Sequence, residues 1–301
     1  MGAVNVATAE LAVDSRCRLG EGIVWDARRA CLYWTDILSA RLWMHVPATG
    51  QTRHWDLPEP LGCLALCEDG RLLLALAKSI RLAAAPVPGA SLALETLCAL
   101  EPDLGASTRS NDGRCDRHGN FVFGTKDETG ADPPLGRFYQ FSAAHGLRPL
   151  PAAAVPNSIC FSPDGATMYW CDTAQPRILR GDYDPVRASV SNVRVFAETR
   201  DGRAPDGSTV DAAGGLWNAH WDGGCVVRHR PDGEVDRVIA IPEGRPTCCA
   251  IGGDRFDTLY VTTARDELDD ATLAAMPTAG GVFALALDAG SGIAEPRFRP
   301  A

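Results

Sequence analysis

The sequence has neither a cluster of basic residues nor a long run of apolar ones. Its 301 residues carry a formal net charge of −9, and the 29 lysines and arginines are scattered among 38 aspartates and glutamates. Nucleic acid and anionic membranes are therefore poor partners, because both attract concentrated positive charge. No apolar stretch is long enough to span a bilayer. The first residues also lack the charged region and apolar core of a signal peptide.

The eleven cysteines show no metal-binding arrangement. A zinc–thiolate site needs closely spaced pairs of Cys with matching Cys or His partners, whereas Cys248 and Cys249 are adjacent and have no His at ligand spacing. Most of the others lie among apolar residues, as Cys63 and Cys160 do. Such thiols behave as small apolar side chains, so we expect them to be buried and reduced, in a cytoplasmic protein.

Common catalytic motifs are missing as well. The chain has no Gly-x-Ser-x-Gly elbow, no Walker loop and no dinucleotide fingerprint. Nucleophilic serine chemistry and phosphate binding are therefore unsupported. The six histidines show no ligand spacing, and we interpret His220 as a structural histidine at the end of a strand.

Helical signals are weak, and strand-like apolar runs occur throughout the chain. Only residues 267–276, just before Pro277, suggest a short helix. When the chain is aligned on its turns, six segments of about 40 to 50 residues line up, each with four strand-like runs. They begin near Glu21, Gly62, Asn111, Asn157, Asp206 and Thr247. Four strands at this period are typical of a propeller blade, so the fold we predict is an all-β, six-bladed β-propeller with four-stranded blades.

The start of the chain suggests how this ring closes. Residues 7–13 form a strand-like run ahead of the first segment and would complete the last blade, which removes exposed sheet edges. Proline and glycine are spread among the turns, and no linker is evident. We therefore expect a single domain over residues 1–301, and a closed ring favours a monomer.

Polar residues recur at one position of the repeat, just ahead of the first strand of each segment. In a propeller this strand lines the central channel, so residues at equal phase converge near the axis. Glu21, Asn157 and Asp206 would supply two carboxylates and an amide oxygen, a hard-oxygen set for Ca²⁺, Mg²⁺ or Mn²⁺, with Fe²⁺ and Zn²⁺ as further candidates. Three protein ligands leave positions open for water and substrate. The simpler alternative is that these residues only cap turns.

Phase within the repeat, rather than local sequence, distinguishes Asp206. Asp164 and Asp232 each lie in the same Pro-Asp-Gly triplet, but at the hairpin position of their segments, so we expect ordinary turns there. Arg109 and Asn111 are two residues apart and would face the channel together on an extended chain. An arginine fork and an amide can hold the hydroxyls or carboxyl of a polar ligand; the alternative is a surface arginine beside an Asx-turn.

Four motifs together resemble the gluconolactonase/regucalcin (senescence marker protein) family of sugar lactonases, over nearly the whole chain. The motifs are LGEGIVW at 19–25, RSNDGRCD at 109–116, PNSICFS at 156–162 and PDGSTVD at 205–211. The resemblance implies a six-bladed propeller that hydrolyses a small-molecule sugar lactone with one divalent metal ion. It implies metal ligands at Glu21, Asn157 and Asp206, and substrate-binding residues at Arg109, Asn111 and Glu128.

The mechanism implied by the resemblance has water attacking a carbonyl that the metal polarises, with Asp206 as the base and the aldonic acid as product. Because a carboxylate bound to a dication is a weaker base than a free one, metal-bound hydroxide oriented by Asp206 is an equal alternative. Two other functions stay open: a non-catalytic calcium-binding regulator, and a different propeller esterase or phosphotriesterase. Neither the sugar nor the metal can be named from the sequence.

Overall fold

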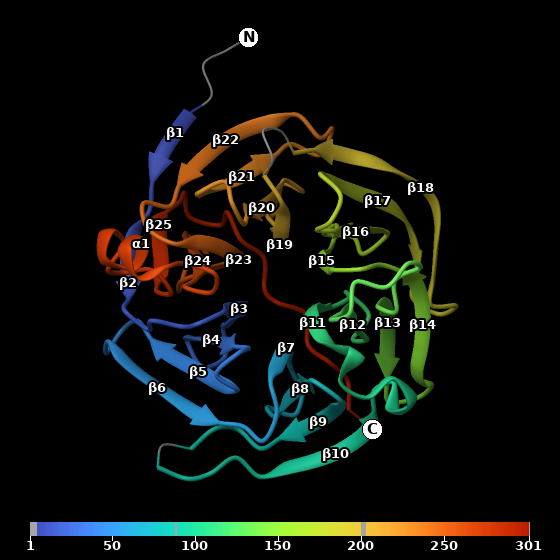
Figure 1. Ribbon diagram of the computed structural model, residues 1–301. Helices are drawn as coiled ribbons and strands as arrows, with labels where there is room; N and C mark the ends of the chain where they lie inside the picture. The colour runs from blue at the N-terminus through green and yellow to red at the C-terminus, as the bar shows by residue number, and fades with distance from the viewer. Residues whose placement is uncertain (1–4, 88, 200–202, 301) are drawn as a thin grey trace.

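Six antiparallel sheets surround a central axis in the computed structural model, which describes residues 5–87, 89–199 and 203–300 (Figure 1). The prediction of an all-β, six-bladed β-propeller is confirmed. The absence of a signal peptide was predicted from the first residues of the chain. Of these, residues 1–4 lie outside the described residues.

The first four blades are each built from four strands that follow one another in the chain, and the fifth and sixth also take in N-terminal strands. The innermost strands are β3 (Gly20–Asp26), β7 (Leu61–Leu66), β11 (Thr108–Cys115), β15 (Pro156–Phe161), β19 (Pro205–Val210) and β23 (Arg245–Gly252). The second strands are β4 (Cys31–Asp36), β8 (Leu72–Leu76), β12 (Phe121–Asp127), β16 (Thr167–Asp172), β20 (Leu216–His220) and β24 (Thr258–Ala264). The third strands are β5 (Arg41–Val46), β9 (Ser79–Ala83), β13 (Arg137–Ser142), β17 (Arg177–Asp184), β21 (Cys225–His229) and β25 (Val282–Ala286). The outer strands are β6 (Gln51–Asp56), β10 (Leu94–Ala99), β14 (Gly146–Ala152), β18 (Ser189–Glu198), β22 (Val235–Ala240) and β2 (Glu10–Val13).

The N-terminal strands join two different blades. Strand β2 pairs antiparallel with β25 and completes the sixth blade, as predicted for residues 7–13. Strand β1 (Asn5–Thr8) instead pairs parallel with β22 and adds a fifth strand to the fifth blade. The predicted single strand is divided at Ala9, so the start of the chain links the fifth and sixth blades (Figure 1).

The core consists of apolar layers between neighbouring blades. On β8, Leu73 packs with blade three and Leu74 packs with blade one, because successive side chains of a strand point to opposite faces. A strand buried on both faces reads as a continuous apolar run, which explains the sequence of β8. All eleven cysteines are free thiols, and all except the partly buried Cys98 are buried, as predicted.

The C-terminal strap, residues 287–300, leaves the sixth blade and crosses the ring, as the red segment of Figure 1 shows. The Phe298 N–H donates to Leu66, and the Phe298 carbonyl accepts from the Glu68 N–H. Arg297 pairs with Asp26. These partners lie at the turns between the first and second strands, so the strap closes the end of the channel that is opposite to the starts of the inner strands.

Helix α1 (Asp270–Ala275) follows β24 and falls within the predicted residues 267–276. Asp269 begins it by accepting a hydrogen bond from the Thr272 N–H, and Pro277 follows its end. A 3₁₀ segment, η1 (Pro102–Ser107), precedes β11. In the described parts of the chain, no helix has both the length and the apolarity that a bilayer crossing demands.

Candidate metal and substrate site

Every innermost strand has a bulge at the same point of its pairing with the second strand. The pairing shifts between Glu21 and Val24 in blade one, and between Asn157 and Cys160 in blade four. A bulge re-aims the side chains around it. In blade four the bulge needs a left-handed backbone at Ser158, with φ of 60°. The bulges therefore set the direction of the residues that share the predicted phase.

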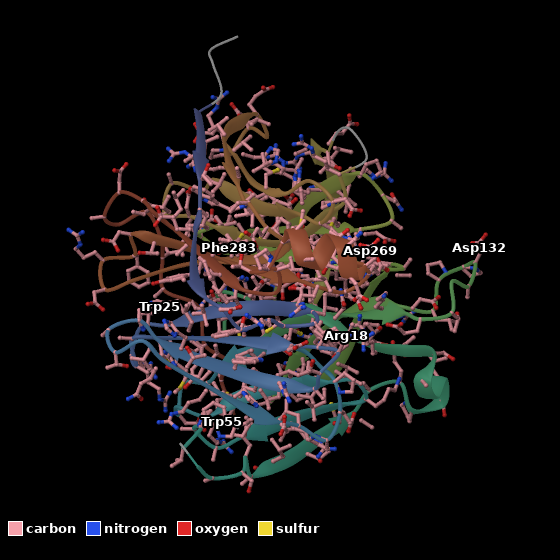
Figure 2. The ribbon with its side chains drawn as sticks, turned by 60° about the vertical axis from the view of Figure 1, so that its left-hand side comes forward. Arg18, Trp25, Trp55, Asp132, Asp269 and Phe283 are labelled. Carbon is pink, nitrogen blue, oxygen red and sulfur yellow. The ribbon has the colours of Figure 1, made fainter. Side chains whose placement is uncertain are left out.

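The polar residues at this phase line one pocket of about 350 Å³. Four share this phase, Glu21, Asn111, Asn157 and Asp206, and the pocket also contains Arg109 and Glu128. All six predicted site residues thus lie in one pocket. The further lining residues are Arg18, Leu19, Leu38, Lys126, Val155, Thr173, Trp221, Asp266 and Glu267. In Figure 2, Arg18 lies toward the same side of the ring as Asp269 and the loop with Asp132, and away from Trp25.

The inner strands of blades two and six contribute no ligand at this phase. A side chain at Gly62 would place its Cβ 2.5 Å from Ser110 atoms, so the strand approaches too closely for any other residue. The Thr247 hydroxyl donates to the Gly20 carbonyl and lies 2.8 Å from the Thr262 hydroxyl. Neither residue lines the pocket.

Glu21 and Asp206 bring two carboxylates into the buried end of the pocket, where they are 7% and 4% exposed. Burial and the nearby Asp112 carboxylate raise the pKa of Glu21 to about 8. Burial, followed by Glu21 and Asp112, raises the pKa of Asp206 well above its usual value. The Glu21 Oε2 accepts from the Gly22 N–H at 3.1 Å. The Asp206 Oδ1 has no hydrogen-bond partner in the described structure.

These two carboxylates fit a bound cation. Buried negative charges that lack donors destabilise a protein unless a positive charge compensates for them. Carboxylate and amide oxygens are the ligands that hard divalent cations prefer. Among the described residues, no three His, Cys, Asp or Glu side chains form a metal cluster; the predicted set differs from such a cluster because Asn157 is its third member.

Asn157 is held in place through both atoms of its amide. Its Nδ2 donates to the Thr173 hydroxyl at 2.7 Å, and its Oδ1 accepts from the Asn111 Nδ2 at 3.0 Å. The hydroxyl of Thr173 in turn donates to the Pro205 carbonyl at 2.8 Å. An amide oxygen has two lone pairs, so Asn157 Oδ1 retains one for a ligand. The chain of bonds ties blade three to blades four and five around the site.

Arg109 is fixed beside the carboxylates. Its Nε contacts Glu128 Oε1 at 2.8 Å, and its Nη1 donates to the Asn111 Oδ1 at 2.8 Å. The predicted neighbours Arg109 and Asn111 therefore touch one another, and Glu128 joins them from the end of β12. The side chain of Arg109 is only 12% exposed, so its remaining donors are directed by this packing.

Two residues in or beside the pocket were not predicted. Asp112 lies behind the lining, buried next to Asn111, and accepts from the Gly113 and Ile159 N–H groups at 2.8 and 2.9 Å, which joins β11 to β15. Lys126 lines the pocket two residues before Glu128. Alternation along β12 was the available signal for Lys126, because residues two apart on a strand share a face.

The remaining predictions concern His220 and the look-alike turns. His220 is buried, does not line the pocket, and has its pKa lowered to about 4, mainly by burial. It is thus a buried residue outside the pocket, as interpreted, but neither of its ring nitrogens has a hydrogen-bond partner among the described residues. Asp164 accepts from the Ala166 N–H and Asp232 from the Glu234 N–H at exposed hairpins. Both are ordinary turn residues, as predicted.

Comparison with known proteins identifies the family of the chain. Residues 19–265 match the model of the SMP-30/gluconolactonase/LRE-like region. The chain belongs to this family. It is 47% identical to an L-arabinolactonase of Azospirillum brasilense over 296 residues, which cover 96% of this chain and 95% of that protein. It is 37% identical to a 6-deoxy-6-sulfogluconolactonase of Pseudomonas putida, with 93% and 94% covered.

A solved structure of the same family shares the fold. It is the crystal structure of a calcium-binding protein, regucalcin, from Agrobacterium tumefaciens, and it superimposes with a TM-score of 0.91. The two proteins are 32% identical, and the match covers 99% of this chain and all of that one. The resemblance drawn from the four sequence motifs is therefore confirmed at the level of the family.

Proposed function

We propose that this protein is a sugar lactonase that uses one divalent metal ion to open a sugar-acid lactone to its aldonic acid. The observation that carries the proposal is the pocket itself, where a partnerless Asp206 oxygen lies among the predicted ligands and beside a fixed arginine–amide pair. The names of the two relatives, an L-arabinolactonase and a sulfogluconolactonase, support the substrate class.

Glu21, Asn157 and Asp206 would hold the metal ion, because they combine two carboxylates with an amide oxygen. When bound, the ion supplies Lewis acidity at the lactone carbonyl and compensates the two carboxylates. Its identity, among Ca²⁺, Zn²⁺, Mn²⁺, Mg²⁺ and Fe²⁺, is left to experiment.

Asp206 would orient the attacking water and accept its proton. Its Oδ1 has no hydrogen-bond donor in the described structure, so this oxygen remains available to a water molecule. The rest of the residue is fixed, because its carbonyl accepts from the Ser158 hydroxyl and from the Asn218 Nδ2 at 2.8 Å. A fixed base holds the nucleophile in an attacking geometry.

Arg109, Asn111 and Glu128 would bind the hydroxyls of the sugar. Their mutual contacts leave Arg109 with unused N–H donors and Glu128 with a second carboxylate oxygen. Leu19, Leu38, Val155 and Trp221 line the same pocket and provide an apolar wall for the carbon skeleton.

The deciding experiment measures lactone hydrolysis as proton release in weak buffer. The protein is stripped with a chelator, then reloaded with each divalent ion and given a panel of pentono- and hexonolactones. We expect no turnover without metal and restored turnover with at least one ion. Metal binding without hydrolysis of any lactone would instead favour a calcium-binding regulator. Cleavage of other esters or phosphotriesters alone would favour a different hydrolase.

We also propose that the protein acts as a cytoplasmic monomer built as a single domain over residues 1–301. The closed ring supports the monomer, because both ends of the blade series are joined by β2. Light scattering coupled to size-exclusion chromatography measures the mass directly; a dimer mass at micromolar concentration would contradict this proposal.

A further inference from the structure

Lysine is scarce in this chain, and one of the few lysines lies in the pocket. Only two of the 29 lysines and arginines are lysines, Lys78 and Lys126. Lys78 has a structural role, since its Nζ donates to the Thr108 hydroxyl at 3.0 Å and to the Thr108 carbonyl at 3.3 Å. Lys126 lines the pocket together with all six predicted site residues. The two lysines therefore form a natural pair for comparison.

The ammonium of Lys126 has donors that the protein does not use. Strand pairing places Lys126 opposite Arg109. Its Nζ lies 3.7 Å from Glu128 Oε1, the oxygen that Arg109 already contacts at 2.8 Å. No hydrogen bond from Lys126 Nζ occurs within the described residues, although an ammonium has three donors. The side chain is 32% exposed, so a ligand in the pocket can reach it.

The charges around Lys126 separate it from the other pocket cations. Arg109 is paired with Glu128, and Arg18 is paired with Asp266 at 3.3 Å at the rim. Lys126 is also near enough to Asp206 for its charge to act on that carboxylate. Lys126 thus provides a cation without a hydrogen-bond partner among the described residues, in the pocket that contains the proposed metal ligands and on the strand that pairs with that of Arg109.

We propose that Lys126 contacts the substrate and stabilises the negative charge that forms on the lactone carbonyl oxygen and, after the acid product ionises, the charge on its carboxylate. This inference rests on the proposed lactonase function. In the reaction the water oxygen bonds to the carbonyl carbon, the bond from that carbon to the ring oxygen breaks, and the ring oxygen takes a proton. The acid product then loses a proton at neutral pH, while the ammonium keeps its own protons and only donates hydrogen bonds.

Charge development makes such a contact catalytic. The lactone is neutral and the intermediate is anionic, so a charge-assisted hydrogen bond from Lys126 strengthens as the reaction proceeds. Interactions that are stronger in the transition state than in the ground state raise kcat. Loss of one such donor costs about 10²-fold where the donor acts alone; a metal ion that shares the charge lowers this cost.

The first test compares the kinetics of lysine variants of the metal-loaded enzyme. We expect Lys126→Met to lower kcat by ~10-fold or more with little change in KM, and Lys126→Arg to restore part of the loss. Lys78→Arg, the matched control, should keep the wild-type values. The inference is wrong if Lys126→Met keeps its kcat, or if only KM rises. A wild-type enzyme that hydrolyses no lactone would instead overturn the proposed function.

The second test observes the lysines directly and does not depend on turnover. Reductive ¹³C-methylation of the protein yields signals from Lys78, Lys126 and the N-terminal amine, which Lys78→Arg and Lys126→Arg assign. The labelled protein, loaded with a diamagnetic ion such as Ca²⁺ or Zn²⁺, is titrated with the aldonate product. We expect a saturable shift of the Lys126 signal alone. An unmoved Lys126 signal at saturating product, or equal shifts of both lysines, would contradict the contact.

Discussion

The two ends of the inner strands use the same kinds of side chain in opposite ways. At the pocket end of β19, the Asp206 Oδ1 has no partner among the described residues. Five residues later, at the strap end, Asp211 accepts hydrogen bonds from four donors. They are the backbone N–H groups of Ala213 and Gly215, the Trp217 indole and the Arg228 guanidinium.

The strap-end half of this pattern recurs in blades one and three. Glu21 is followed five residues later by Asp26, which pairs with Arg29 and Arg297. Asn111 is followed at the same interval by Asp116, whose oxygens accept from the His118 and Asn120 N–H groups and from the Tyr183 hydroxyl.

The difference separates structural carboxylates from functional ones. Buried polar groups in folded proteins are normally hydrogen-bonded, so an unsatisfied one in a pocket is a candidate to bind an ion, water or ligand. The strap end follows this rule and holds its turns together. At the pocket end, Asp206 departs from this rule. Its Oδ1 has no partner among the described residues, so a partner would have to be a bound ion, water or ligand.

The largest expected effect comes from Asp206→Ala. We expect kcat to fall by ~10³-fold, because both a metal ligand and the oxygen facing the water are lost. Stability of the metal-free protein should stay level or rise, since a buried carboxyl group whose Oδ1 lacks a hydrogen-bond partner is removed. Steady-state kinetics and thermal melting of the chelated protein measure the two quantities. A large loss of stability would place Asp206 among the structural carboxylates.

Asp211→Ala should show the reverse pattern. It leaves Arg228 and the Trp217 indole without their acceptor, so we expect a loss of about 2–4 kcal/mol in the free energy of unfolding. The activity of each folded molecule should be unchanged, because Asp211 lies at the other end of the strand. Urea unfolding with active-site titration checks both. Wild-type stability in this variant would remove the contrast between the two ends.

Metal removal should destabilise the wild-type protein but not Asp206→Ala. A ligand present at 100 times its Kd stabilises the folded state by about 2.7 kcal/mol. We therefore expect chelation to lower the Tm of the wild type, and re-addition of the metal to restore it. Differential scanning calorimetry of both proteins, with and without chelator, measures the shifts. Equal shifts in the two proteins would place the cation elsewhere.

The smallest effect is expected from Asp164→Ala, which tests phase against local sequence. Asp164 lies in the same Pro-Asp-Gly triplet as Asp206 but at an exposed hairpin. We expect less than about 1 kcal/mol of lost stability and no change in kcat. Denaturation and kinetic assays run beside Asp206→Ala provide the comparison. Loss of activity would mean that the triplet itself, rather than its register, carries the function.

The repeated features were predictable from sequence, whereas the features that occur once were not. Glu21, Asn157 and Asp206 share a phase, so six aligned segments indicated both the blades and the pocket residues. Glu128 followed only from the resemblance to the family, and it lines the pocket in contact with Arg109. Asp112 follows Asn111 directly, and Lys126 lies two residues before Glu128. Their roles could not be predicted, because they depend on which side chains the strands turn toward the pocket.

The strap and strand β1 escaped prediction for a related reason. Residues 287–300 have no copy elsewhere in the chain and no regular strand or helix pattern that would indicate where they bind. Phe298 is 0% exposed because it packs into the apolar layer between blades two and three, where it stacks on Phe141. Likewise, residues 7–13 read as one strand, and their division between two blades depends on the distance that the chain must span between them.

The contacts of the strap also limit the order in which the parts of the molecule can fold. Its partners at Asp26, Leu66 and Gly119 are synthesised long before residues 287–300 emerge, and strand β2 must likewise wait for β25. Contacts between segments so far apart in sequence form slowly, because the whole intervening chain must first be ordered. Residues 282–300 therefore complete both the ring and its closed end, and a chain that stops before them has neither.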